Sequence, residues 1–108
     1  MNKIDELVKE HFWNYDPKQK ERLSPNTKVY HRENISYLFL FDNLIAKNDI
    51  KNKTLYIDFK GYTTKTTKNR LNSILSKINS QISYHRGLPL LDNHIYLPTD
   101  KFYQINYK

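Results

Sequence analysis

Apolar residues near the start of the chain recur every three or four positions: Ile4, Leu7, Val8 and Phe12. This is the period of an amphipathic helix. Asn2 can act as its N-cap, and Asp5 and Glu6 follow in the first turn, where the helix dipole favours negative charge. We therefore predict an N-terminal helix.

A polar connector and three strands are expected next. Residues 14–28 contain two prolines and few apolar residues, which is typical of a long connector that orders only against a partner. From Val29 to Asp42 the chain is rich in β-branched and aromatic residues and predicts strand, either continuous or interrupted near Glu33. Leu44 to Lys47 and Thr54 to Phe59 add two strands, so we expect an antiparallel meander.

One segment of the first strand, Tyr37 to Phe41, is apolar on both faces. Two interpretations fit this pattern. The strand is central and covered on both sides, or it is covered on one side and uses the other in an interface, such as a homodimer through the Tyr37–Phe41 region.

The second predicted helix runs from Lys68 to about Ser83. Its apolar residues follow helical spacing: Leu71, Ile74, Leu75, Ile78 and Ile82. Gly87 prevents a continuation, and His94 to Leu97 and Phe102 to Tyr107 can add one or two short strands. The order predicts an α+β fold, in which a small antiparallel sheet of three to five strands is accompanied by the N-terminal helix and by one longer amphipathic helix after the third strand.

Composition supports one folded domain over residues 1–108. The chain of 108 residues contains 9 Tyr and 5 Phe, so we expect an aromatic-rich core despite a hydrophobic content of 38%. With no cysteine, disulfides and thiolate metal sites are excluded. The absence of a leader-like start and of a long apolar run predicts a soluble protein of the cytoplasm, here that of a bacterial host cell. Heavy use of Lys, Asn, Ile and Tyr is typical of low-GC bacteria or their phages.

Charge is distributed unevenly along the chain, whose net charge is +7. Between Asp58 and Asp92 there is no acid, whereas six basic residues fall in this window and the remainder is almost neutral. Such a one-signed patch attracts polyanions, so the expected partner is a nucleic acid, a host nucleic-acid-processing protein, or both.

The start of the second helix carries the clearest candidate site. Its first turn holds Lys68 and Arg70 where acids are usual, and a Thr-rich loop with Lys65 precedes it. An incoming anion would compensate this arrangement; alternatively, Thr66 or Thr67 is an N-cap and the lysines are solvated. Arg70, Ser73, Lys77 and Ser80 also form one row along the helix, which either tracks a phosphate backbone or only faces solvent.

The predicted surface for nucleic acid, another anion or a protein partner comprises Lys60, Tyr62, Thr64, Lys65, Thr66, Thr67, Lys68, Arg70, Ser73, Lys77, Tyr84 and Arg86. Tyr62 and Tyr84 offer stacking surfaces at its ends. The four histidines form no metal-binding or catalytic motif, so we expect no catalytic residue, no metal, no cofactor and no enzyme activity; a metal-independent nuclease is the enzymatic alternative.

The segment from His31 to Leu75 resembles a family of small bacteriophage and mobile-element accessory proteins. The shared features are an aromatic strand (Ile35 to Phe39), a short strand (Leu44 to Ala46) and a step from paired threonines into a helix (Thr66 to Arg70). The resemblance implies a counter-defence role, such as that of anti-CRISPR-like inhibitors, and carries over no catalytic residue.

Three functions remain open at this point. The first is a non-enzymatic, phage-type accessory protein that acts on host nucleic-acid machinery, such as an anti-CRISPR-like inhibitor of a defence nuclease. The second is a stand-alone nucleic-acid-binding protein. The third is a structural or oligomerising protein with no affinity for polyanions.

Overall fold

The computed structural model describes residues 2–18 and 20–107; residues 1, 19 and 108 of the predicted domain, and residue 19 of the predicted connector, lie outside this description. The described helices are α1 (Lys3–Trp13), α2 (Lys65–Leu75) and the 3-10 helix η1 (Ser76–Ile78). The described strands are β1 (Lys20–Ser24), β2 (Thr27–Arg32), β3 (Ile35–Leu40), β4 (Asn43–Asp49), β5 (Thr54–Ile57), β6 (Ile82–His85), β7 (Leu88–Leu91), β8 (Ile95–Tyr96) and β9 (Tyr103–Asn106).

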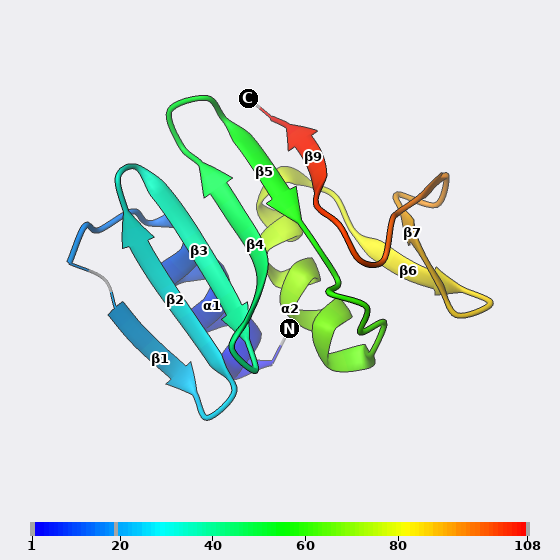
Figure 1. The fold of residues 1–108 in the computed structure, drawn as a ribbon, viewed down its shortest axis with the longest axis horizontal. Helices are drawn as coiled ribbons and strands as arrows, with labels where there is room; N and C mark the ends of the chain where they lie inside the picture. Colours follow the sequence, from blue (N-terminus) through cyan, green and yellow to red (C-terminus); the bar gives the residue numbers. More distant parts are fainter. Residues whose placement is uncertain (1, 19, 108) are drawn as a thin grey trace.

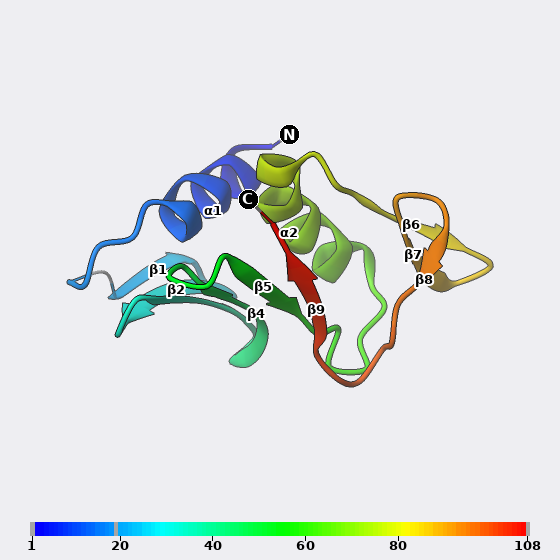
Figure 2. The same cartoon turned by 90° about the horizontal axis from the view of Figure 1, so that it is seen from above.

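The strands form two antiparallel sheets. The larger has six strands in the order β1-β2-β3-β4-β5-β9, and the smaller has three in the order β6-β7-β8. Both α-helices pack on the same face of the larger sheet (Figure 2), and the smaller sheet lies to one side of it (Figure 1). The predicted α+β class, the N-terminal helix and the helix after the meander are therefore confirmed, although the structure has more strands than predicted and α2 follows β5.

The core lies between the six-stranded sheet and the two helices. Buried residues alternate along the strands, as in β3, where Leu38 and Leu40 are buried and Tyr37 and Phe39 point to the other face. The helices contribute the opposing apolar side chains: Val8, Phe12, Leu71, Ile74 and Leu75. Strand β3 is thus central and covered on one side, by the helices, so the interpretation that it is covered on both sides is wrong.

Tight turns connect the meander strands. At Glu33–Asn34 and at Phe41–Asp42 both central residues have positive φ, as in type I′ turns, whose twist matches that of the flanking strands. The Val29–Asp42 stretch is accordingly a hairpin of β2 and β3 with a break at Glu33, in agreement with the second of the two predicted alternatives.

The predicted connector over residues 14–28 is wrong in its second half. Strand β1 pairs with β2, with Arg22 opposite Lys28, so this segment is the edge of the sheet. Its sequence lacks a strand pattern because an edge strand tolerates charged residues. Among the side chains described for β1, Leu23 is the hydrophobic one that packs, partly buried, against the core.

The predicted second helix is too long. It begins at Lys65 rather than Lys68, passes into η1, and ends where Asn79 adopts a left-handed backbone (φ 60°) and its N–H bonds Ser76 O. Ile82 is buried as the helical spacing suggested, but it belongs to β6 and not to the helix. Its backbone N–H donates to Asn72 Oδ1, and its carbonyl accepts from Asn72 Nδ2.

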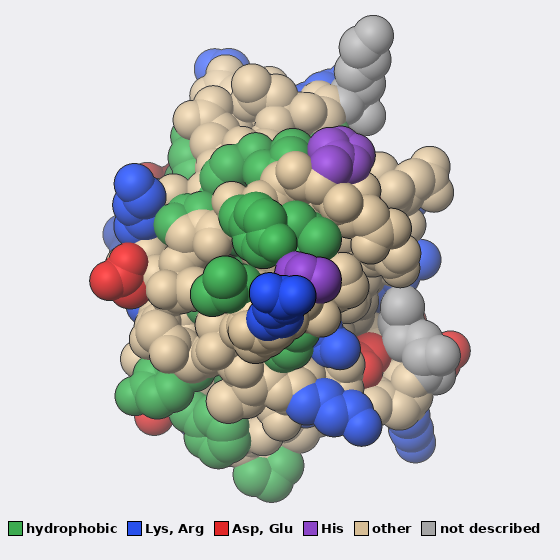
Figure 3. Space-filling view, turned by 90° about the vertical axis from the view of Figure 1, so that its right-hand side faces the viewer, with side chains coloured by type: hydrophobic (Ala, Val, Ile, Leu, Met, Phe, Trp, Pro, Cys, Tyr) green, Lys and Arg blue, Asp and Glu red, His purple; other side chains and the backbone are tan. Residues whose placement is uncertain are grey.

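The three-stranded sheet presents apolar side chains to solvent. Leu88, Ile95 and Tyr96 are exposed, and the face of the molecule on this side shows hydrophobic groups gathered beside histidine and basic side chains (Figure 3). Within the described residues, no helix is long and apolar enough to cross a membrane.

Candidate functional site

The N-terminus of α2 is capped by Thr64. Its Oγ1 accepts from the backbone N–H of Thr67 at 3.2 Å and lies 3.0 Å from Thr67 Oγ1. Thr67 is buried, so its hydroxyl belongs to the cap and not to the exposed surface. The cap therefore lies two residues or more before the positions that the sequence suggested, Thr66 and Thr67.

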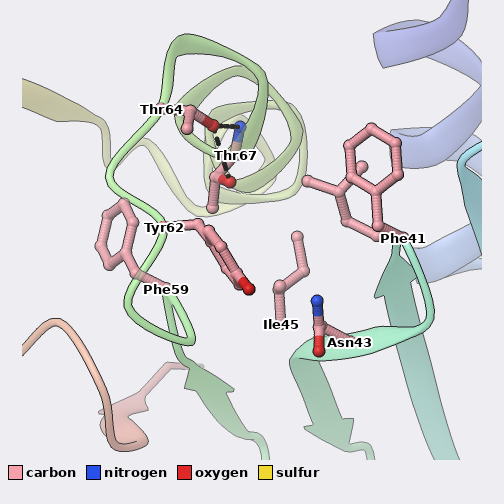
Figure 4. Close-up of a pocket in the computed structure, with 8 residues that line it drawn as sticks. Phe41, Asn43, Ile45, Phe59, Tyr62, Thr64 and Thr67 are labelled. Carbon is pink, nitrogen blue, oxygen red and sulfur yellow. Dashed lines mark hydrogen bonds between the residues drawn. The ribbon is translucent and has the colours of Figure 1, made fainter.

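A pocket of about 400 Å³ opens beside this helix end. Its lining comes from the β3–β4 hairpin, the loop after β5 and α2: Leu40, Phe41, Asn43, Ile45, Phe59, Tyr62, Thr64 and Thr67. Phe41 stands on one side and Phe59 and Tyr62 on the other, with the Thr64–Thr67 cap above (Figure 4). Both Phe41 (64% exposed) and Tyr62 (58% exposed) are unusually accessible for aromatic residues.

Positive charge accompanies the pocket. The first turn of α2 contains no acid, Lys65 is exposed, and Lys68 Nζ lies 5.1 Å above the Tyr84 ring. The Tyr84 hydroxyl donates to Thr64 O at 2.6 Å, and burial raises the pKa of Tyr84 to about 12, so it stays a donor. Tyr84 on β6 thus hydrogen-bonds the capping residue Thr64, and its ring contacts Lys68.

Three residues of the predicted site are not at the surface: Thr67, described above, and Arg70 and Ser73. Arg70 and Ser73 are buried, and the proposal that they form an exposed basic row is wrong. Arg70 Nη1 donates to Asp5 Oδ1 at 2.9 Å, and Ser73 Oγ donates to the carbonyl of Arg70. The row faces α1, because the apolar stripe of α2 packs toward the sheet and the adjoining side of the helix meets α1.

Three further cations are dispersed. Lys77 lines a pocket together with Glu6 and Glu10 of α1, so the basic row is not free of acids there. Arg86 is in the β6–β7 turn. Lys60 pairs with Asp58 at 3.4 Å and lies over the Phe102 ring at 5.0 Å. The structure thus gathers only part of the predicted set at the surface beside the pocket: Tyr62, Thr64, Lys65, Thr66, Lys68 and Tyr84. We call these residues, with Phe41, the loop–helix surface.

Sequence reasoning missed Phe41 as a site residue. Its φ is 49°, a left-handed conformation that is unfavourable for a bulky side chain and that glycine or asparagine usually occupies in such turns. The sequence does contain a feature that could have identified it. A two-residue Phe-Asp turn between apolar strands places an aromatic residue where Asn-Gly is the common choice. A strained, exposed Phe beside a pocket is a pattern associated with functional sites.

No group of three or more His, Cys, Asp or Glu that could hold a metal ion occurs among the described residues. This geometry defines the class of protein: a small α+β protein with a basic loop–helix surface beside an apolar pocket. The chain belongs to the Kyanoviridae Gp96 family, a family of bacteriophage proteins whose model matches residues 1–107. The phage origin that the resemblance implied is thereby confirmed. Neither a curated protein nor a solved structure matches the chain.

Proposed function

We propose that this phage protein is a non-enzymatic accessory protein that acts on host nucleic-acid machinery by binding nucleic acid at its loop–helix surface. One observation carries the proposal: an apolar pocket flanked by exposed Phe41 and Tyr62 adjoins an acid-free helix N-terminus that carries Lys65 and Lys68.

Each part of this surface suits one part of a nucleotide. The first N–H groups of a helix lack intrahelical partners and carry partial positive charge, so that end of α2, with Lys65 and Lys68, attracts a phosphate. Thr64 Oγ1 satisfies the N–H of Thr67. In an α-helix the N–H groups of the first residues, here Lys65 and Thr66, point toward the N-terminal end. The rings of Phe41 and Tyr62 can stack on a base placed in the pocket.

A titration with labelled nucleic acids tests the proposal. Single-stranded and duplex DNA and RNA are titrated at about 50 and 200 mM salt, because each phosphate contact adds roughly one unit to the slope of log K against log salt. We expect Lys65→Glu/Lys68→Glu to weaken binding at least tenfold and to reduce the slope. The control is Lys3→Glu/Lys51→Glu, which changes the net charge equally at two exposed positions outside the surface.

Arg70→Glu is unsuitable as a test, since it would break a buried ion pair. Binding that survives Lys65→Glu/Lys68→Glu unchanged would remove the loop–helix surface from the contact. If no nucleic acid binds at low salt, the accessory role would instead require an acidic groove on a host nuclease, as for an anti-CRISPR-like inhibitor. Pull-down of such a nuclease by the native chain but not by the Lys65→Glu/Lys68→Glu variant would then identify it.

A further inference from the structure

The face of the six-stranded sheet that the helices leave uncovered is aromatic and basic. This open sheet face looks toward the viewer in Figure 1 and away from both helices in Figure 2. Strand pairing places its side chains in two rows across the strands: Arg22, Lys28, Phe39 and Leu44 in one, and Tyr30, Tyr37, Lys47, Tyr56 and Gln104 in the other. All six strands of the larger sheet therefore contribute to a continuous surface.

Lysines and rings are interleaved on this face. Lys28 Nζ lies 4.8 Å from the centre of the Phe39 ring, and Lys47 Nζ lies 5.0 Å from the centres of both the Tyr56 and the Phe102 rings. Lys60 Nζ lies over Phe102 at the same distance. Tyr30 and Tyr37 pack with their ring centres 5.9 Å apart. Each of these ammonium groups thus lies 4.8–5.0 Å from the centre of a partly exposed aromatic ring, within cation–π range.

Among the residues described, acids lie beside the two rows and not within them. Within the described part of the chain, neither row contains a carboxylate, and Asp49 lies in the next row opposite Ile35. The carboxylate of Asp49 accepts from the backbone N–H and from the side-chain amide of Asn52, which hold it at the hairpin end. Asp58, the partner of Lys60, is 2% exposed. The two rows therefore carry Arg22, Lys28 and Lys47 with no carboxylate among their described residues.

We infer that the open sheet face binds single-stranded nucleic acid, with bases stacked on Tyr37, Tyr56 and Phe39. The ammonium groups of Lys28 and Lys47 then move from over the Phe39 and Tyr56 rings to the phosphates. Aromatic platforms recognise single strands because unpaired bases expose their π-faces, whereas a duplex hides these faces within its stack. Neighbouring strands are about 4.8 Å apart, so Tyr37 on β3 and Tyr56 on β5 present stacking positions about 10 Å apart with Lys47 between them.

Charge complementarity favours this ligand over a second copy of the chain. Two open sheet faces brought together would oppose their lysines without acids to pair them, and like charges in direct opposition are destabilising. The inference takes its class of ligand, nucleic acid, from the proposed function. The residues that it assigns to binding lie outside the loop–helix surface.

The test compares sheet variants with matched controls. Anisotropy titrations use labelled single strands of about 12 nucleotides and duplexes of the same length. Known single-strand-binding domains cover roughly 4–16 nucleotides, so this length is sufficient. We expect single strands to bind more tightly than duplexes. Tyr37→Leu/Tyr56→Leu should weaken single-strand binding at least tenfold, since it removes two stacking rings but keeps apolar bulk. The control is Tyr96→Leu, which changes an exposed tyrosine of the other sheet.

A charge variant keeps the test valid if the ring variant does not fold. Lys47→Glu should weaken single-strand binding about tenfold and lower the salt slope by about one unit, whereas Lys3→Glu on α1 should do neither. Thermal melting of each variant separates loss of binding from loss of folding.

The outcomes distinguish this inference from the proposed function. If the sheet variants bind like the native chain and only Lys65→Glu/Lys68→Glu loses affinity, the inference is overturned and the proposed function stands. If the sheet variants lose affinity and the loop–helix variant does not, the inference stands and the proposed surface is overturned. Equal or tighter duplex binding overturns the single-strand preference. A dimer that Lys47→Glu strengthens, with no nucleic-acid binding at low salt, overturns both and assigns the face to a second copy.

Discussion

Arg70 on α2 donates from Nη1 to Asp5 Oδ1 on α1 at 2.9 Å, and from Nε to Thr27 Oγ1 on β2 at 3.0 Å. The side chains of Arg70 and Asp5 are 9% and 8% exposed. One guanidinium therefore joins both helices to the sheet. A buried charge of this kind is tolerated because each partner is hydrogen-bonded and neutralised by the other.

Removing one partner of this pair should destabilise the fold strongly. Asp5→Ala leaves the Arg70 guanidinium buried without its counter-charge, and we expect the free energy of unfolding to fall by about 3–5 kcal/mol. Urea denaturation followed by the fluorescence of Trp13, which lies against α2 through its bond to Ile74 O, measures this. Glu6→Ala is the control, because Glu6 is an exposed acid in the same helical turn. Equal losses in both variants would show that the pair contributes nothing specific.

The cap of α2 predicts different effects for substitutions at two neighbouring threonines. Thr64→Ala should lower the free energy of unfolding by about 1 kcal/mol, because the Thr67 N–H loses its acceptor. Thr66→Ala, two residues later and outside the cap, should change it by less than about 0.5 kcal/mol. Thermal denaturation of the two variants decides between Thr64 and the N-cap at Thr66 that the sequence also allowed.

Phe41 should show opposite effects on stability and binding. Phe41→Asn relieves the positive φ at this position, so we expect stability to rise by about 0.5–1 kcal/mol. The same change removes one wall of the pocket and should weaken nucleic-acid binding at the loop–helix surface. Glu33→Asn is the matched control, because Glu33 also has positive φ in a hairpin turn but does not line the pocket. This variant should gain stability and bind nucleic acid with unchanged affinity. A loss of stability in Phe41→Asn would contradict the strain at Phe41.

His31 should make stability depend on pH. It is 2% exposed, its Nδ1 lies 2.8 Å from the Asp16 backbone N, and burial lowers its pKa below 6.5. The unfolded chain therefore takes up a proton at a higher pH than the folded chain does. The stability that neutral His31 contributes is complete above pH 6.5 and declines as the pH falls below that value.

Denaturation at several pH values between about 5 and 8 measures this effect. His31→Gln should flatten the decline below pH 6.5, whereas His94→Gln, at an exposed histidine, should leave it as in the native chain. A decline that persists unchanged in His31→Gln would assign the pH dependence to other groups.

Much of the fold could be predicted from local patterns. The helical period of Ile4 to Phe12 and the cap at Asn2 correspond to α1, in which Asn2 Oδ1 accepts from Asp5 N. The strand patterns correspond to β2 to β5 within one or two residues. Strand β1 was missed because an edge strand does not require alternating apolar residues. Ile82 was misplaced because burial in a strand and burial in a helix leave the same mark at a single position.

The candidate site was less predictable. The residues near Tyr62 to Lys68, and Tyr84, were identified from the acid-free window, the expected helix start and the aromatic residues at its ends, and the structure does bring them together. Arg70 had the same local sequence signal as Lys68. It is nevertheless buried, because it forms an ion pair with Asp5, which lies 65 residues earlier in the chain.

The sequence by itself determined the class of fold, the periods of its main elements and the excess of positive charge, because these depend on the order of neighbouring residues. Only the tertiary structure decided which cations are available. It buried Arg70, placed Lys77 beside acids of α1, and set Lys28 and Lys47 among the rings of the open sheet face. The physical reason is that the exposure and the counter-charge of a side chain depend on residues far from it in the chain, which meet it only when the helices pack on the sheet.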